Sequence, residues 1–135
     1  MITVVFACVH NAGRSQMAAA FFNTLADRAM AGAVSAGTQP ADHVNPVVVE
    51  AMREAGIDIS AAVPQRLTEP LARQASLLVT MGCGDECPYL PGLQRDDWPL
   101  ADPKGRPLPE VRGIRDDIRQ RVAALIEAQG WGLGV

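Results

Sequence analysis

The residues with the clearest chemistry stand near the N-terminus, between Cys8 and Ser15. Cys8 and Arg14 are separated by five residues in the segment Cys-Val-His-Asn-Ala-Gly-Arg-Ser. A cysteine thiolate is a nucleophile, and a guanidinium can donate two parallel hydrogen bonds to two oxygens of a phosphate-like anion. These residue types at this spacing predict a site that binds a tetrahedral oxyanion and attacks it with sulfur.

The elements on either side of this segment must position it. The apolar run Ile2–Ala7 predicts a buried strand, and an alanine-rich segment with apolar residues at helical spacing predicts a helix over 14–31. A loop between a strand and a helix turns several backbone N–H groups toward one point, and the helix N-terminus adds a partial positive charge. Such donors favour the thiolate of Cys8. The oxyanion-binding residues that we expect are Val9, His10, Asn11, Ala12, Gly13, Arg14 and Ser15.

Three residues of the loop have more specific expected roles. Ser15 could hydrogen-bond the Cys8 sulfur or cap the helix that begins here. Gly13 permits a φ that a side chain would resist. Asn11 tolerates the left-handed region and can tie the loop to itself.

The remaining pattern alternates strands with helices. We predict further strands at 33–36 and 77–81 and a short one within 93–100, with Trp98 buried. Further helices are expected from Pro46 to Ala55, at 69–74 and at 111–129, and 103–109 is expected to be a loop. This order predicts an α/β fold, a three-layer sandwich with a four-stranded parallel sheet covered on both faces. At 135 residues the chain has room for one core, so we expect a single domain over 1–135.

Composition narrows the class of function. A net charge of −3 gives no electrostatic reason to bind nucleic acid or an anionic membrane. No apolar run is long enough to span a bilayer, and the N-terminus lacks the basic region of a signal peptide. Three cysteines without a secretory signal indicate a reducing compartment, so we expect a cytoplasmic protein. A metal site at Cys83 and Cys87 is not expected, because only His10 and His43 are available as further ligands.

Several segments together resemble a known family. The sequence over 8–18, 35–38, 81–85, 97–98 and 102–103 resembles the arsenate reductases built on the low-molecular-weight tyrosine phosphatase fold. The resemblance implies that Cys8 attacks the oxyanion, that Arg14 holds it and that Asp102 is the general acid. From the residues alone, Asp102 is a solvated aspartate in a turn. The implied function is arsenate reduction to arsenite in arsenic detoxification, with no bound cofactor.

The residue after the Asp-Pro pair departs from the related phosphatases. Those enzymes place a tyrosine there to grip an aryl ester, whereas this chain has Lys104. A small inorganic anion is therefore favoured as substrate. A tyrosine phosphatase remains the alternative, because arsenate and phosphate share shape and charge.

Cys83 and Cys87 leave two routes open for the electrons. In one route, Cys83 attacks the adduct on Cys8 and Cys87 then forms a disulfide that thioredoxin reduces. In the other, both are spectators and a low-molecular-weight thiol accepts the arsenic. The loop variant Val-His-Asn-Ala-Gly most resembles the actinobacterial branch that uses mycothiol. We favour that route, with mycoredoxin as the partner.

Overall fold

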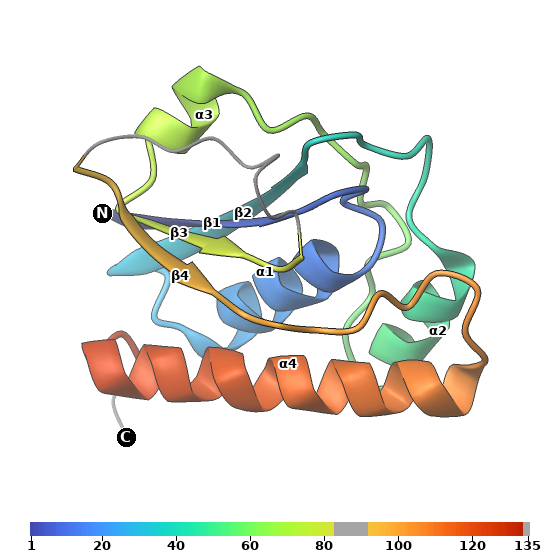
Figure 1. Ribbon diagram of the computed structural model, residues 1–135. Coiled ribbons are helices and arrows are strands. Elements are labelled where there is room, and N and C mark those ends of the chain that lie inside the picture. Colours follow the sequence, from blue (N-terminus) through green and yellow to red (C-terminus); the bar gives the residue numbers. More distant parts are fainter. Residues whose placement is uncertain (83–91, 134–135) are drawn as a thin grey trace.

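Four short parallel strands form the sheet of the protein, in a computed structural model that describes residues 1–82 and 92–133 (Figure 1). The strands are β1 (Ile2–Cys8), β2 (Ala31–Gly37), β3 (Leu77–Thr80) and β4 (Gln94–Asp97). The helices are α1 (Arg14–Leu25), α2 (Pro46–Glu54), α3 (Glu69–Arg73) and α4 (Leu108–Gln129). The strand order is β2-β1-β3-β4 and every pairing is parallel, so the predicted sheet is confirmed.

The sheet separates two layers of helices. Helices α1, α2 and α4 lie on one face and α3 lies on the other (Figure 1). Because successive side chains of a strand point to opposite faces, Phe6 of β1 joins the larger core with Phe22 and Trp98, while Val5 joins a smaller core with Leu78. The predicted three-layer α/β sandwich is therefore confirmed, and Trp98 is buried as expected.

The first helix is shorter than its sequence predicts. It ends at Leu25, where Ala26 is already extended, and residue 31 begins β2. The side chain of Asn23 bonds both the N–H and the carbonyl of Ala33, at 2.8 and 2.9 Å. Ala31 pairs with Ile2 in the sheet. The predicted continuation of the helix to residue 31 is wrong because pairing with β1 outweighs the local helix propensity of this alanine-rich segment.

The last helix is longer than expected. It begins at Leu108 rather than at 111, after Pro107, and Pro109 lies in its first turn. A proline is accepted there because the first N–H groups of a helix have no partner within the helix. The other predicted elements agree with the structure to within about three residues at their ends. No described helix is long and apolar enough to cross a membrane.

Candidate active site

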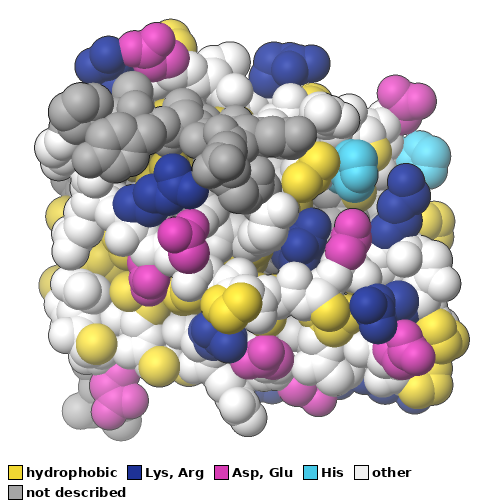
Figure 2. Space-filling view, in the orientation of Figure 1, with side chains coloured by type: hydrophobic (Ala, Val, Ile, Leu, Met, Phe, Trp, Pro, Cys, Tyr) yellow, Lys and Arg dark blue, Asp and Glu magenta, His cyan; other side chains and the backbone are white. Residues whose placement is uncertain are grey.

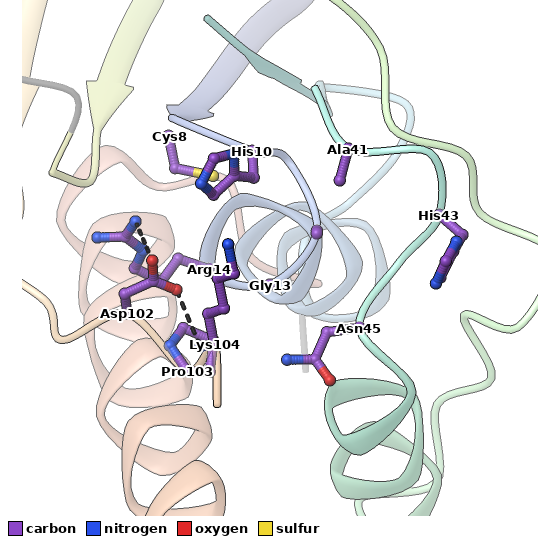
Figure 3. Close-up of a pocket in the computed structure, with 11 residues that line it drawn as sticks. Cys8, His10, Gly13, Arg14, Ala41, His43, Asn45, Asp102, Pro103 and Lys104 are labelled. Carbon is purple, nitrogen blue, oxygen red and sulfur yellow. Dashed lines mark hydrogen bonds and ion pairs between the residues drawn. The ribbon is translucent and has the colours of Figure 1, made fainter. Parts of the chain in front are cut away.

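The segment between β1 and α1 lies at the carboxyl end of a central strand. β1 ends at Cys8 and α1 begins at Arg14. A pocket of about 200 Å³ opens there (Figure 3). The described residues that line it are Cys8, His10, Ala12, Gly13, Arg14, Ala41, His43, Asn45, Asp102, Pro103 and Lys104. The structure thus brings together the three predicted catalytic residues. Four of the predicted oxyanion-binding residues are among the described residues that line the pocket: His10, Ala12, Gly13 and Arg14. The other three, Val9, Asn11 and Ser15, are not among them.

The carbonyl groups of the loop are directed away from the pocket into the segment that follows β2. The carbonyls of residues 8, 9, 10 and 12 accept hydrogen bonds of 2.7 to 3.2 Å from the N–H groups of Thr38, Gln39, Ala41 and Asn45. Among residues 1–82 and 92–133, no backbone acceptor bonds the N–H groups of Val9, His10, Ala12 and Gly13. Since no backbone acceptor among the described residues bonds them, these N–H groups can donate to an anion.

The sulfur of Cys8 has two polar neighbours. Cys8 is only 2% exposed, its Sγ lies 2.9 Å from the Ser15 Oγ, and the Asn11 N–H donates to it at 3.3 Å. Of the two roles expected for Ser15, the structure has the contact with sulfur. The residue that precedes α1 is Gly13, and no side chain caps the helix.

Asn11 orients the hydroxyl group of Ser15 beside the Cys8 sulfur. The Asn11 Oδ1 accepts the backbone N–H of Gln65 at 2.9 Å, which identifies the oxygen of this amide. The Asn11 Nδ2 therefore donates to the Ser15 Oγ, at 2.7 Å. The hydroxyl hydrogen of Ser15 is then not used by Asn11, and it can be donated to the Cys8 sulfur when that sulfur is a thiolate.

Asn11 holds the loop together from its centre. It is fully buried and has a φ of 50°, so the predicted left-handed conformation is confirmed. The Gln16 Nε2 donates to the carbonyl oxygen and to the Oδ1 of Asn11, each at 3.1 Å. Sequence reasoning missed Gln16 and Gln65 as supports of this loop. Gln65 reaches Asn11 from 54 residues away, so no local pattern could have indicated it.

Two glycines leave room for the side chains that line the pocket. Gly13 has a φ of −144°, outside the left-handed region, so a positive φ is not the reason for glycine there. A Cβ at Gly13 would lie 2.6 Å from the Pro103 Cγ. Gly82 has a φ of +88°, and a Cβ there would overlap the Arg14 Nη1. Both positions therefore require the absence of a side chain.

Arg14 and Asp102 lie side by side in the pocket and form an ion pair (Figure 3). Arg14 is 6% exposed, its Nη1 donates to the Leu100 carbonyl at 3.2 Å, and its Nη2 lies 3.7 Å from the Asp102 Oδ2. The Asp102 side chain is 46% exposed, and its Oδ1 accepts the Lys104 N–H at 3.0 Å. The buried guanidinium of Arg14 can bind an anion from the interior side of the pocket, and the Asp102 carboxyl group can reach the same anion from the solvent side.

The family follows from a comparison of the whole chain. Residues 3–130 match the model of the low molecular weight phosphotyrosine protein phosphatase family. The chain belongs to this family. A protein named putative arsenate reductase from Halobacterium salinarum is 40% identical over 126 residues, which are 90% of this chain and 89% of that protein.

Solved structures of similar fold carry two kinds of names. A thioredoxin-dependent arsenate reductase from Corynebacterium glutamicum aligns with a TM-score of 0.82 and 38% identity over 95% of this chain, which spans 61% of that longer chain. A mutant arginine phosphatase with a phosphorylated active-site serine aligns with a TM-score of 0.78 and 25% identity over 96% of each chain.

The two remaining cysteines and a possible metal complete the description of the site. Cys83 and Cys87 lie outside the described residues. Within the described residues, no group of three or more histidine, cysteine, aspartate or glutamate side chains could hold a metal ion. In this member of the phosphatase family, the described pocket brings together a cysteine side chain, a guanidinium, a carboxyl group and backbone N–H groups.

Proposed function

We propose that the protein is an arsenate reductase that uses Cys8 as its nucleophile. The observation that carries this proposal is the position of the Cys8 sulfur, held by Ser15 and Asn11 in a pocket with the Arg14 guanidinium and the Asp102 carboxyl group. The Halobacterium relative, named putative arsenate reductase, supports it over nine-tenths of the chain.

The first step forms a bond between sulfur and arsenic. The Cys8 thiolate attacks the arsenic atom while Arg14 and the N–H groups of the loop bind the oxygens. The bond from arsenic to the opposite oxygen breaks, and Asp102 gives that oxygen a proton so that it leaves as water. Asp102 suits this role because its Oδ2 lies 3.7 Å from the Arg14 Nη2 and therefore beside the same anion.

The second step reduces arsenic. In the route through Cys83, its thiolate attacks the Cys8 sulfur, a disulfide bond forms between them, and the electron pair of the bond between the Cys8 sulfur and arsenic stays on arsenic. In the external-thiol route, mycothiol first displaces the Cys8 sulfur from arsenic, and a thiol of mycoredoxin then attacks the mycothiol sulfur with the same result. Arsenic passes from As(V) to As(III) and leaves as arsenite, while two thiols are oxidised to one disulfide. A dithiol reductant must then reduce this disulfide before the next turnover.

The source of the second thiol is the finer part of the proposal. The loop sequence led us to expect mycothiol and mycoredoxin, but the Corynebacterium relative is named thioredoxin-dependent, which favours thioredoxin. Cys83 follows directly after Gly82, which packs against the guanidinium of Arg14. We therefore place a relay through Cys83 and Cys87 ahead of mycothiol. Either route needs a reducing compartment, which for this protein we propose is the cytoplasm.

A phosphatase is the second candidate. The same N–H groups and guanidinium fit phosphate, and the arginine phosphatase relative carries a phosphoryl group on its active-site serine. In this alternative, Cys8 forms a phosphocysteine that water hydrolyses. Lys104, in place of the tyrosine of related phosphatases, favours arsenate.

Arsenate turnover with separate reductants tests these alternatives. We expect arsenite release with thioredoxin, thioredoxin reductase and NADPH, and slow hydrolysis of p-nitrophenyl phosphate. The variant Cys83→Ser with Cys87→Ser should stop after the first adduct with thioredoxin. Full turnover of this variant with mycothiol and mycoredoxin would establish the external-thiol route instead. Fast ester hydrolysis without arsenite production would establish the phosphatase.

A further inference from the structure

Lys104 is a cation of the pocket whose side chain the proposed reaction leaves without a role. It is the single lysine of the chain and lines the pocket with Cys8 and Arg14. Its side chain extends from the turn beside Pro103 toward the loop (Figure 3). Within residues 1–82 and 92–133, no carboxylate forms an ion pair with it.

The backbone of Lys104 is fixed although its side chain is exposed. The Lys104 N–H donates to the Asp102 Oδ1 at 3.0 Å, and the Arg106 N–H donates to the Pro103 carbonyl at 3.0 Å. The Arg106 Nε also donates to the Asp102 carbonyl, at 2.7 Å. These bonds close a turn over the pocket, and Pro103 anchors the turn by its contact with Gly13. The starting point of the lysine side chain is therefore set relative to the loop.

The charges of the other pocket residues suggest what this lysine does. Among the described lining residues, Arg14 and Lys104 are the permanent cations. Asp102 offsets Arg14 when ionised, and the Cys8 thiolate adds a negative charge that faces the incoming dianion. Both histidines of the chain also line the pocket, on a face where basic and acidic side chains are mixed (Figure 2). Without Lys104, Arg14 is the one arginine or lysine side chain that the described lining of the pocket offers to a dianion.

We propose that Lys104 is a specificity-determining residue that selects unsubstituted tetrahedral dianions over their monoesters. This inference rests on the proposed function and deepens it by naming the substrate class. An unsubstituted dianion presents a small hydroxyl oxygen at the solvent side of the pocket, and this oxygen can accept a hydrogen bond from the ammonium group. A monoester presents its organic substituent there instead, so it loses this contact and must displace the lysine side chain.

Binding measurements on the full chain carrying Cys8→Ser test the inference without any turnover. Calorimetry gives the affinities for inorganic phosphate and for phenyl phosphate, and their ratio is the readout. Lys104→Met keeps the length of the side chain and removes its charge. We expect it to weaken phosphate binding about fivefold, the weight of one exposed ion pair, and to change phenyl phosphate binding less than about twofold. Lys104→Arg should restore the ratio.

A matched control separates this role from a general effect of charge. Arg121→Met removes a cation from α4, where Arg121 pairs with Asp117, and should leave both affinities unchanged. Equal weakening of both ligands by Lys104→Met, or no weakening of either, would overturn the inference. The thermal midpoint of each variant checks its fold.

The test also separates this inference from the proposed function. If the wild-type chain does not reduce arsenate but Lys104→Met still shifts the ratio, the proposed function fails and the selection of dianions stands. If arsenate is reduced and the ratio does not shift, only the role of Lys104 is rejected.

Discussion

The two sides of the pocket are built in opposite ways. The loop over 8–15 is largely buried, and its backbone is bonded to the segment that follows β2 and to Gln65. The turn over 101–106 is exposed except for Pro103, and three of its hydrogen bonds are made within the turn itself. The groups that we propose to bind the anion are therefore fixed before substrate arrives, while the proposed acid and the lysine reach the pocket from a solvent-exposed turn.

This difference predicts different consequences of mutation on the two sides. A change in the loop alters the groups that we propose to bind the substrate, and these groups are held by many hydrogen bonds, so it should affect turnover or binding strongly. A change in the turn should alter proton delivery or selectivity without loss of the fold. The following variants test this contrast, from the largest expected effect to the smallest.

Cys8→Ser should abolish arsenate turnover and leave oxyanion affinity within about threefold of wild type. A serine hydroxyl stays protonated and is a weak nucleophile without a base, whereas Arg14 and the loop N–H groups remain. Arsenite production and calorimetry with phosphate measure the two quantities. Turnover above background in this variant would exclude Cys8 as the nucleophile.

Asp102→Asn should lower kcat by roughly two orders of magnitude, the usual scale of general acid catalysis, and change KM much less. The acid acts in the transition state, and asparagine cannot supply its proton. The pH profile of kcat is the sharper readout, because the limb that reports the protonated acid should disappear. A profile that keeps both limbs would assign the proton to another group.

Arg14→Lys should lower kcat/KM at least tenfold, or about 1.4 kcal/mol. A single ammonium replaces a planar group that can bind two oxygens and that also donates to the Leu100 carbonyl. Gly82→Ala is an independent test of the same contact, because its Cβ would overlap the Arg14 guanidinium. Wild-type kinetics in both variants would mean that Arg14 does not bind the oxyanion.

Glu54→Gln should leave turnover unchanged and alter only the pH dependence of stability. Hydrogen bonds from Arg112 and then Arg115, with their charges, lower the pKa of the Glu54 carboxyl group below its usual 4.5. A lowered pKa in the folded state contributes stability above the unfolded value, and this contribution is lost as pH falls through the folded value. The difference in thermal midpoint between wild type and variant should be positive at pH 7 and vanish in acid. A difference that persists at the lowest pH would assign it to packing.

The sequence predicts the loop side of the pocket better than the turn side. A buried strand, a Cys-x5-Arg loop and a helix are consecutive, so their local pattern predicts the cradle and the left-handed Asn11. The supports of the loop come from distant segments, and neither Gln65 nor Gly82 carries a local sign of its contact with it. Their roles required the structure.

The turn side shows a different limit. A single Asp-Pro pair is compatible with any solvated turn, so the sequence alone does not predict that Asp102 lies near Arg14. The family resemblance implies this proximity, and the structure shows it. The predicted end of α1 is wrong for a related reason. Alanine favours a helix locally, but the pairing of Ala31 with Ile2 is decided by the sheet.

Protection of Cys8 from alkylation tests most directly whether the nucleophile and the oxyanion share one site. In the variant Cys83→Ser with Cys87→Ser, Cys8 is the single cysteine, so its reaction with iodoacetamide can be followed by mass spectrometry. The account predicts that arsenate and phosphate slow this reaction in a saturable way, that chloride at equal ionic strength does not, and that Arg14→Lys weakens the protection. An alkylation rate that arsenate leaves unchanged would contradict the account.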